Sequence, residues 1–169
     1  AAGGGGGAEG HAHTQVVLGS RRGETHRSWS ILSGLGADQA WAPTEFRVAV
    51  HNAVIGRWWI RGGSTCEMTG LAAAGDGFEQ GILEAAALLA EGAPAVLLIV
   101  TEEQPPQVYG PWIDDVPFAY ALGLLLTPGK QWQLAPATTA EPSPHGALPH
   151  GLSWLKAMLT GCDSFNHTW

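Results

Sequence analysis

Residues 71–81, with the sequence LAAAGDGFEQG, form a junction of the kind that carries a nucleophile in many enzymes. We expect a short apolar strand to end there in a turn of small residues and a helix to begin at once. The N-terminus of a helix presents free backbone N–H groups and a partial positive charge, which favour a thiolate and an oxyanion. The turn here consists of Gly75, Asp76 and Gly77, and it contains neither Cys nor Ser. It is therefore either a catalytic elbow without its nucleophile or only a tight strand-to-helix turn.

Other residues that could act in catalysis or metal binding form no recognisable set. Asp76 could be a general base, but Asp76 and Glu79 also fit an Asp-x-x-Glu capping box, which explains both residues. Cys66 and Cys162 lie outside the junction, and the histidines of the N-terminal tail have no partner cysteine or carboxylate cluster. We therefore expect no metal and no cofactor.

Composition limits the class of protein. The 169 residues carry a net charge of −7, and no basic stripe is present, so nucleic-acid binding is not expected. Hydrophobic residues make up 45% and charged residues 14%, which favours a largely buried architecture or a subunit that buries surface against a partner. The sequence has no apolar run of about 18 residues that could span a membrane, and it has no signal-peptide pattern. Two cysteines fit a reducing compartment, so we expect a cytoplasmic protein.

Hydrophobic patterning predicts one α/β domain over residues 14–169, preceded by a flexible Gly-rich tail over residues 1–13. Thr44 is the expected N-cap of the second helix, Gly92 is expected to end the third, and Leu159 is expected to face inward from the last. The predicted strands cover residues 14–20, 67–74, 94–103 and 118–128, and the predicted helices cover residues 23–36, 45–62, 76–92 and 151–161.

Five segments of the chain, in their order and spacing, match the pattern of a known protein family. They are SRRGETHRSWSILSGLG (20–36), PTEFRVAVHNAVIG (43–56), HNAVIGRWWIRGG (51–63), TGLAAAGDGFEQGILEAAALLAEGAPAVLLIVTEE (69–103) and FAYALGLLLTPG (118–129). The third segment is similar to the ketosynthase helix before the nucleophile strand, and the fourth is similar to the elbow, the Ala-rich helix and the next strand. The chain thus resembles, over roughly residues 15–169, the β-ketoacyl-synthase-like N-terminal domain family. Members of this family are also called chain length factors and are associated with aryl-polyene and type II polyketide or fatty-acid gene clusters.

This resemblance implies a layered, thiolase-like half-domain with a mixed sheet packed against helices. It places Gly75 at the position of the nucleophilic Cys, in a vestigial elbow with Asp76 and Gly77. Since glycine cannot form a thioester, the resemblance implies a non-catalytic subunit, a chain length factor. Such a subunit pairs with an active ketosynthase and helps to shape the cavity that holds the growing acyl chain. The implied partners are a ketosynthase-like protein, in a hetero- or homodimer, and an acyl carrier protein.

Two other functions remain open at this point. The chain could be a divergent β-ketoacyl synthase or acyltransferase that uses another residue, or it could be an α/β binding domain with no acyl role. Three arginines, Arg21, Arg22 and Arg27, could contact an acidic carrier protein or only carry solvated charge. The residues that could line a pocket or an interface are His51, Asn52, Trp58, Trp59, Phe78 and Gln80.

Overall fold

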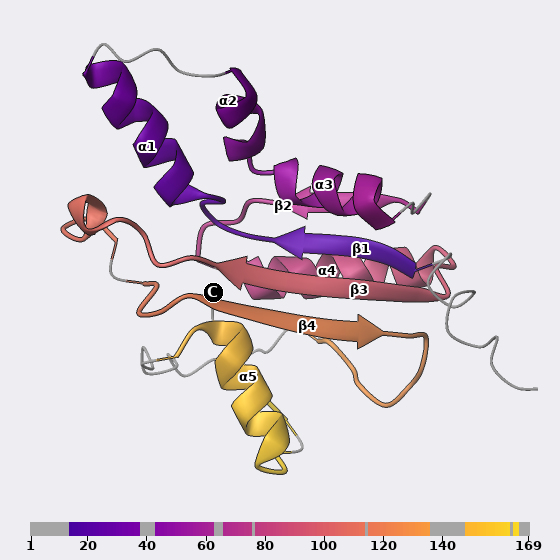
Figure 1. The fold of residues 1–169 in the computed structure, drawn as a ribbon. Coiled ribbons are helices and arrows are strands. Elements are labelled where there is room, and N and C mark those ends of the chain that lie inside the picture. Colours follow the sequence, from indigo (N-terminus) through magenta and orange to yellow (C-terminus); the bar gives the residue numbers. More distant parts are fainter. Residues whose placement is uncertain are drawn as a thin grey trace, which may run out of the picture.

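The computed structural model describes residues 14–37, 43–62, 66–75, 77–113, 115–135, 148–162 and 164–165 (Figure 1). Strands and helices alternate along this part of the chain, so the predicted α/β class is confirmed. In chain order the elements are β1 (Thr14–Gly19), α1 (Thr25–Gly36), α2 (Pro43–Ala49), α3 (Ala53–Gly62), β2 (Met68–Leu71), α4 (Gly77–Ala90), β3 (Ala95–Glu102), the 3-10 turn η1 (Gln107–Tyr109), β4 (Tyr120–Leu126) and α5 (His150–Leu159).

The strands form one mixed sheet in the order β2-β1-β3-β4. β1 is parallel to both of its neighbours, whereas β4 runs antiparallel to β3. In this register Val17 of β1 lies opposite Thr69 of β2 and Leu98 of β3. Because β2 and β3 point the same way, the chain between them must cross the sheet, and α4 makes that crossing.

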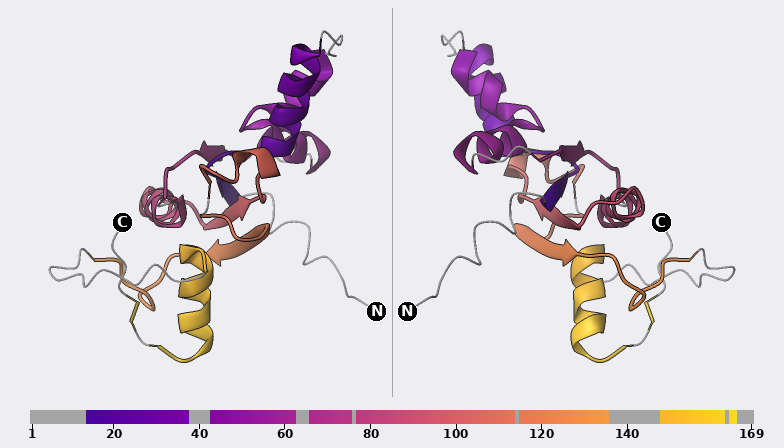
Figure 2. Two further views of the ribbon diagram at one scale, coloured as in Figure 1. Left: turned by 90° about the vertical axis from the view of Figure 1, so that its left-hand side faces the viewer. Right: turned by 90° about the vertical axis from the view of Figure 1, so that its right-hand side faces the viewer.

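The main core lies between α4 and one face of the sheet. Figure 2 looks along the axis of α4 and shows this helix beside the sheet. Val96 and Leu98 of β3 point to this face and are fully buried. The strand registers place Val17 and Leu122 on the same face, and both are also buried. The helix can approach the sheet closely because Gly81 has no side chain, since a Cβ there would lie 2.7 Å from Leu98 Cδ1.

The C-terminal end of α4 forms as the sequence predicts. Gly92 has a φ of +106°, which is favourable only for glycine. Its N–H donates to the Leu89 carbonyl oxygen at 3.2 Å, and the Ala93 N–H donates to the Leu88 carbonyl oxygen at 3.0 Å. These two bonds satisfy carbonyl groups at the helix end and form a Schellman motif.

The predicted helix over residues 45–62 is wrong, because the chain forms two helices with a break at residues 50–52. The first of them begins at Pro43, so Thr44 lies inside α2 rather than at its cap. The break places His51 beside the end of β1, where its Nε2 donates a hydrogen bond to the Ser20 carbonyl oxygen. This tertiary contact holds the chain out of the continuous helix that the local apolar spacing favours.

The helical arm, which consists of α1, α2 and α3, covers only part of the other face of the sheet. Ile55 of α3 is buried there, and its Cδ1 would lie 3.1 Å from a Cβ on Gly70 of β2. Val16 and Leu18 of β1 share this face and are also buried. Over β4 the same face is more open, since Leu125 is 66% exposed. The arm therefore covers the β1–β2 half of the face.

The last helix packs through its first turns. Gly151 lies against Leu122 and Phe78, and Leu152 and Leu155 are partly buried on the core. Leu159 is 79% exposed, so the prediction that it faces inward is wrong. α5 therefore contacts the rest of the fold at its N-terminal end and faces solvent at its C-terminal end.

Substitution of Gly81 by Ala tests the close approach of α4 to the sheet. We expect this variant to lose roughly 1–3 kcal/mol of the free energy of unfolding, because a new Cβ would overlap the fully buried Leu98 side chain. The matched control is Gly56→Ala in α3, where a Cβ meets no atom within 4 Å and helix propensity favours Ala by about 1 kcal/mol. Urea unfolding followed by circular dichroism measures the free energy of unfolding of both variants. Equal losses of stability in Gly81→Ala and Gly56→Ala would contradict the packing described.

Candidate functional site

The predicted elbow lies at the edge of the sheet where three parallel strands end. The carboxyl ends of β1, β2 and β3 are at Gly19, Leu71 and Glu102, and the arrowheads of β1 and β3 in Figure 1 point to this edge. The Ser20 N–H donates to the Leu71 carbonyl oxygen at 3.1 Å and so joins the chain after β1 to the start of the elbow. Ligands of open α/β sheets bind outside the carboxyl ends of the strands, so the location suits a binding site.

Gly75 is exposed in the turn between β2 and α4. A Cβ on this glycine would meet no atom within 4 Å. The backbone φ angle of Gly75 is not positive. The backbone at this position would therefore accept a side chain such as that of Cys. α4 begins two residues later at Gly77, and its first-turn N–H groups lie next to the turn. Asp76, the predicted N-cap, lies outside the described residues.

Neither cysteine is placed to serve the elbow. Cys66 precedes β2 and is half-buried, so that strand separates it from Gly75 at the opposite end. Cys162 follows α5 and is exposed. Within the part of the chain that the structure describes, a covalent acyl intermediate at the elbow has no thiol to form on.

A network of polar contacts joins the loop after β1 to the chain after β3. The Arg22 guanidinium forms an ion pair with Asp115 at 2.9 Å, and Arg21 pairs with the same carboxylate. The Thr25 hydroxyl donates to Glu103 at 2.7 Å at the start of α1. Arg27 pairs with Glu24, so all three arginines proposed to contact a carrier protein form ion pairs within this chain. The contacts to Asp115 and Glu103 orient the helical arm.

Burial at this edge raises the pKa of two groups. Burial raises the pKa of Glu102 above its ordinary value, although the backbone N–H of Arg21 donates to the carboxylate. Tyr120 lies opposite Glu102 in the β3–β4 register. Burial and the nearby carboxylates of Glu102, Asp115 and Glu79 raise the pKa of Tyr120 to about 12. The half-buried end of β3 therefore disfavours the ionised forms of Glu102 and Tyr120.

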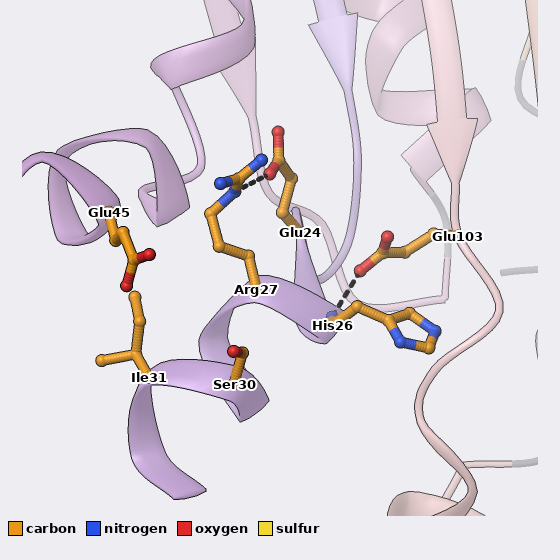
Figure 3. Close-up of a pocket in the computed structure, with 7 residues that line it drawn as sticks. All are labelled: Glu24, His26, Arg27, Ser30, Ile31, Glu45 and Glu103. Atoms are coloured by element: carbon orange, nitrogen blue, oxygen red, sulfur yellow. Dashed lines mark hydrogen bonds and ion pairs between the residues drawn. The ribbon is translucent and has the colours of Figure 1, made fainter. Parts of the chain in front are cut away.

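A pocket of about 370 Å³ lies between α1, α2 and the residues after β3 (Figure 3). Arg27 pairs with Glu24 in its wall, and the His26 N–H donates to Glu103 at 2.8 Å. The lining holds three carboxylates together with the Arg27 guanidinium and the Ile31 side chain, so charged groups of both signs and apolar surface face this pocket. None of the described elbow residues lines it. The lining residues are Glu24, His26, Arg27, Ser30, Ile31, Glu45 and Glu103.

The structure separates the residues predicted to line a pocket or an interface. His51 binds the chain after β1, whereas Asn52 and Trp58 are exposed on the helical arm. Phe78 is buried beneath the elbow, where its ring lies 5.6 Å from that of Trp154. Gln80 is half-buried in the first turns of α4. The sixth, Trp59, lies on α3, and its side chain is outside the described set.

One contact near the elbow is not predicted by the sequence. Glu79 of α4 is only 7% exposed, and its Oε1 lies 2.9 Å from Nδ1 of His150, the first residue of α5. The two residues are 71 positions apart, so no local spacing could have predicted their contact. The buried carboxylate is therefore held by an imidazole from a distant segment.

Two further properties concern only the described residues. No group of three or more His, Cys, Asp or Glu side chains among them is arranged to hold a metal ion. No helix in this part of the chain is both long enough and apolar enough to cross a membrane.

Comparisons with known proteins identify relatives of this chain. The family model for the β-ketoacyl synthase N-terminal domain matches residues 7–169. No curated protein sequence matches significantly. Among solved structures, one similar chain comes from the ketosynthase (ApeO) in complex with its chain length factor (ApeC) from Xenorhabdus doucetiae, with a TM-score of 0.79 and 31% identity. The match covers 89% of this chain and 63% of that chain, so this chain spans less than two thirds of it. The similarity confirms the layered, thiolase-like α/β fold.

Substitution of Glu102 by Gln tests the electrostatics at the end of β3. Gln keeps an oxygen that can accept the Arg21 N–H but carries no charge. Because the pKa of Glu102 is raised in the folded protein, its contribution to stability is complete below the ordinary value of 4.5 and is lost as the pH rises through the folded value. We therefore expect the variant to melt a few degrees higher than the native protein at pH 8, with the difference shrinking toward pH 4.

Thermal unfolding followed by circular dichroism across this pH range measures the effect. The control is Glu67→Gln at an exposed position before β2, which should show no such pH-dependent gain. A lower melting temperature of Glu102→Gln at pH 8 would contradict the assignment.

Proposed function

Because this chain belongs to the β-ketoacyl synthase N-terminal domain family, we propose that it is a ketosynthase-like subunit without a nucleophile. It acts as a chain length factor, or as an equivalent partner of an active β-ketoacyl–ACP synthase, in fatty-acyl or polyketide assembly such as that of aryl polyenes. The observation that carries this proposal is Gly75, which stands in the exposed turn before α4 where the backbone would accept a side chain.

The chemistry of acyl transfer supports a partner role rather than independent catalysis. A ketosynthase holds the growing chain as a thioester on an activated Cys, so the elbow must supply a thiol. Here the elbow keeps a strand, a tight turn and a helix N-terminus, but the turn has no side chain that can be acylated. We infer that the covalent step takes place on the other subunit and that this chain contributes a wall of the acyl cavity.

The helical arm supports binding to another protein. Large apolar side chains gather on the arm at exposed positions, and Ile60 is 77% exposed. An exposed apolar surface of this kind is typical of a protein–protein interface. These side chains are Trp29, Leu32, Leu35, Phe46, Val50, Val54, Trp58 and Ile60. The related structure is described as a complex of a ketosynthase with its chain length factor, which supports a ketosynthase-like protein as the partner.

Exposed arginines on the same arm support a carrier-protein contact. Arg47, Arg57 and Arg61 lie on α2 and α3 at exposed positions, next to the apolar side chains. A positive surface of this kind attracts an acidic acyl carrier protein and raises its rate of association. Because Arg21, Arg22 and Arg27 all form ion pairs within this chain, the arginines of α2 and α3 are the better candidates for this contact.

Co-expression with a complete ketosynthase from the same genome tests the partner role. We expect a stable one-to-one complex in which elongation of acyl chains requires this protein. Substitution of the exposed Ile60 by Asp should reduce co-purification by about tenfold, because it places a charge on the apolar surface of the arm. The matched control is Leu159→Asp at the end of α5, where a leucine of similar exposure (79%) lies away from the arm. A lone monomer or homodimer, with elongation unaffected by its removal, would contradict the proposal and favour a binding domain without an acyl role.

Substitution of Gly75 by Cys tests the elbow geometry separately from the partner. We expect the variant to fold normally and its new thiol to react with iodoacetamide roughly tenfold faster than Cys162 at pH 7, because the α4 N-terminus favours a thiolate. The control is Gly129→Cys, an exposed position with equal space for a Cβ but no helix N-terminus after it. Mass spectrometry of the alkylated peptides over time gives the rates. Equal rates in the two variants would show that residue 75 is not at a nucleophile elbow.

A further inference from the structure

A buried carboxylate at the start of α4 is paired with the first residue of α5. Glu79 lies four positions after Gly75, and it is 7% exposed. A carboxylate in such a position loses the hydration that stabilises its charge, so it requires a compensating donor. His150, whose side chain is 33% exposed, supplies such a donor.

The geometry of the pair defines the roles of its atoms. Nδ1 of His150 lies 2.9 Å from Oε1 of Glu79, the usual distance for a charge-assisted hydrogen bond. An ionised carboxylate can only accept, so Nδ1 carries the hydrogen and donates it. The imidazole therefore serves as a donor from α5 to the helix that follows the elbow.

Close apolar packing surrounds the same contact. A Cβ on Gly151 would lie 2.9 Å from Leu122 Cδ2 and 3.0 Å from Phe78 Cδ2, so the backbone of α5 touches the core there. The ring of Trp154 lies 5.6 Å from that of Phe78. At the far end of α5, by contrast, Leu159 is 79% exposed. Docking of α5 therefore depends on its first turns, and the ionic contact lies at the very first residue.

We propose that the Glu79–His150 pair is a conformational latch that holds α5 against the start of the elbow helix. With the pair intact, α5 covers Phe78 and Leu122. Without the imidazole, the Glu79 carboxylate would remain buried with no donor from α5, and the favourable response is movement of α5 so that water reaches it. Local opening of this kind would expose apolar side chains beneath the elbow while the sheet stays folded. This inference concerns the fold and does not depend on the partner role proposed above.

The proposed latch predicts different effects for substitutions at its two residues. His150→Ala leaves a buried charge and should lower the hydrogen-exchange protection of the α5 amides by roughly ten- to hundredfold. Adding Glu79→Leu to that variant removes the charge and should restore most of the protection, because a buried ion pair can be replaced by apolar groups at little cost. Glu79→Gln keeps an oxygen acceptor for Nδ1 and should have a smaller effect than His150→Ala.

Hydrogen–deuterium exchange with mass spectrometry measures α5 and the strands in the same experiment. Lys156→Ala, an exposed change in the same helix, serves as the control and should leave α5 protection unchanged. Unchanged α5 protection in His150→Ala would overturn the proposal, and so would additive effects in the double variant, which indicate that His150 acts only by packing. Loss of protection in β1 and β3 as well, not reversed by Glu79→Leu, would also overturn it, because a latch acts on α5 alone.

Discussion

The close packing of α4 on the sheet is the contact on which the rest of the structure depends. Two parallel strands separated by β1 can be joined only if the chain between them crosses one face of the sheet, and α4 makes that crossing while burying its apolar side. The helix reaches the required depth because Gly81 leaves room for Leu98. Its start then lies beside the carboxyl ends of the strands, and its end is closed by Gly92. The elbow, the core and the docking of α5 all follow from the position of this helix.

The carboxyl edge of the sheet contains the turn that we propose to be a vestigial elbow. A strand, a turn and a helix follow one another there, and residue 75 is a glycine in open space. Several surrounding polar groups contact one another, since Arg21 and Arg22 pair with Asp115 and the chain after β1 binds His51. Such an edge fits the subunit role proposed above, in which the covalent step takes place on a catalytic partner.

The distribution of apolar side chains separates two parts of the molecule. The α4 face of the sheet is buried within this chain, whereas the helical arm keeps many large apolar side chains at the surface. Burial of that surface against a second protein would recover part of the hydrophobic free energy that the isolated chain cannot gain. The family membership and the similarity to a chain of a two-protein ketosynthase complex make a second protein the natural candidate to cover it.

The sequence by itself determined the features whose physical causes are local. The apolar run of β3, the glycine that ends α4 and the absence of a thiol at residue 75 can all be read from neighbouring residues. Tertiary structure decided the rest. The predicted helix over residues 45–62 is broken because His51 binds a carbonyl group 31 positions away, and that contact outweighs local helix propensity. Glu79 was expected only to cap its own helix, but its carboxylate also binds an imidazole 71 positions away, a pairing that no spacing within one helix or strand encodes.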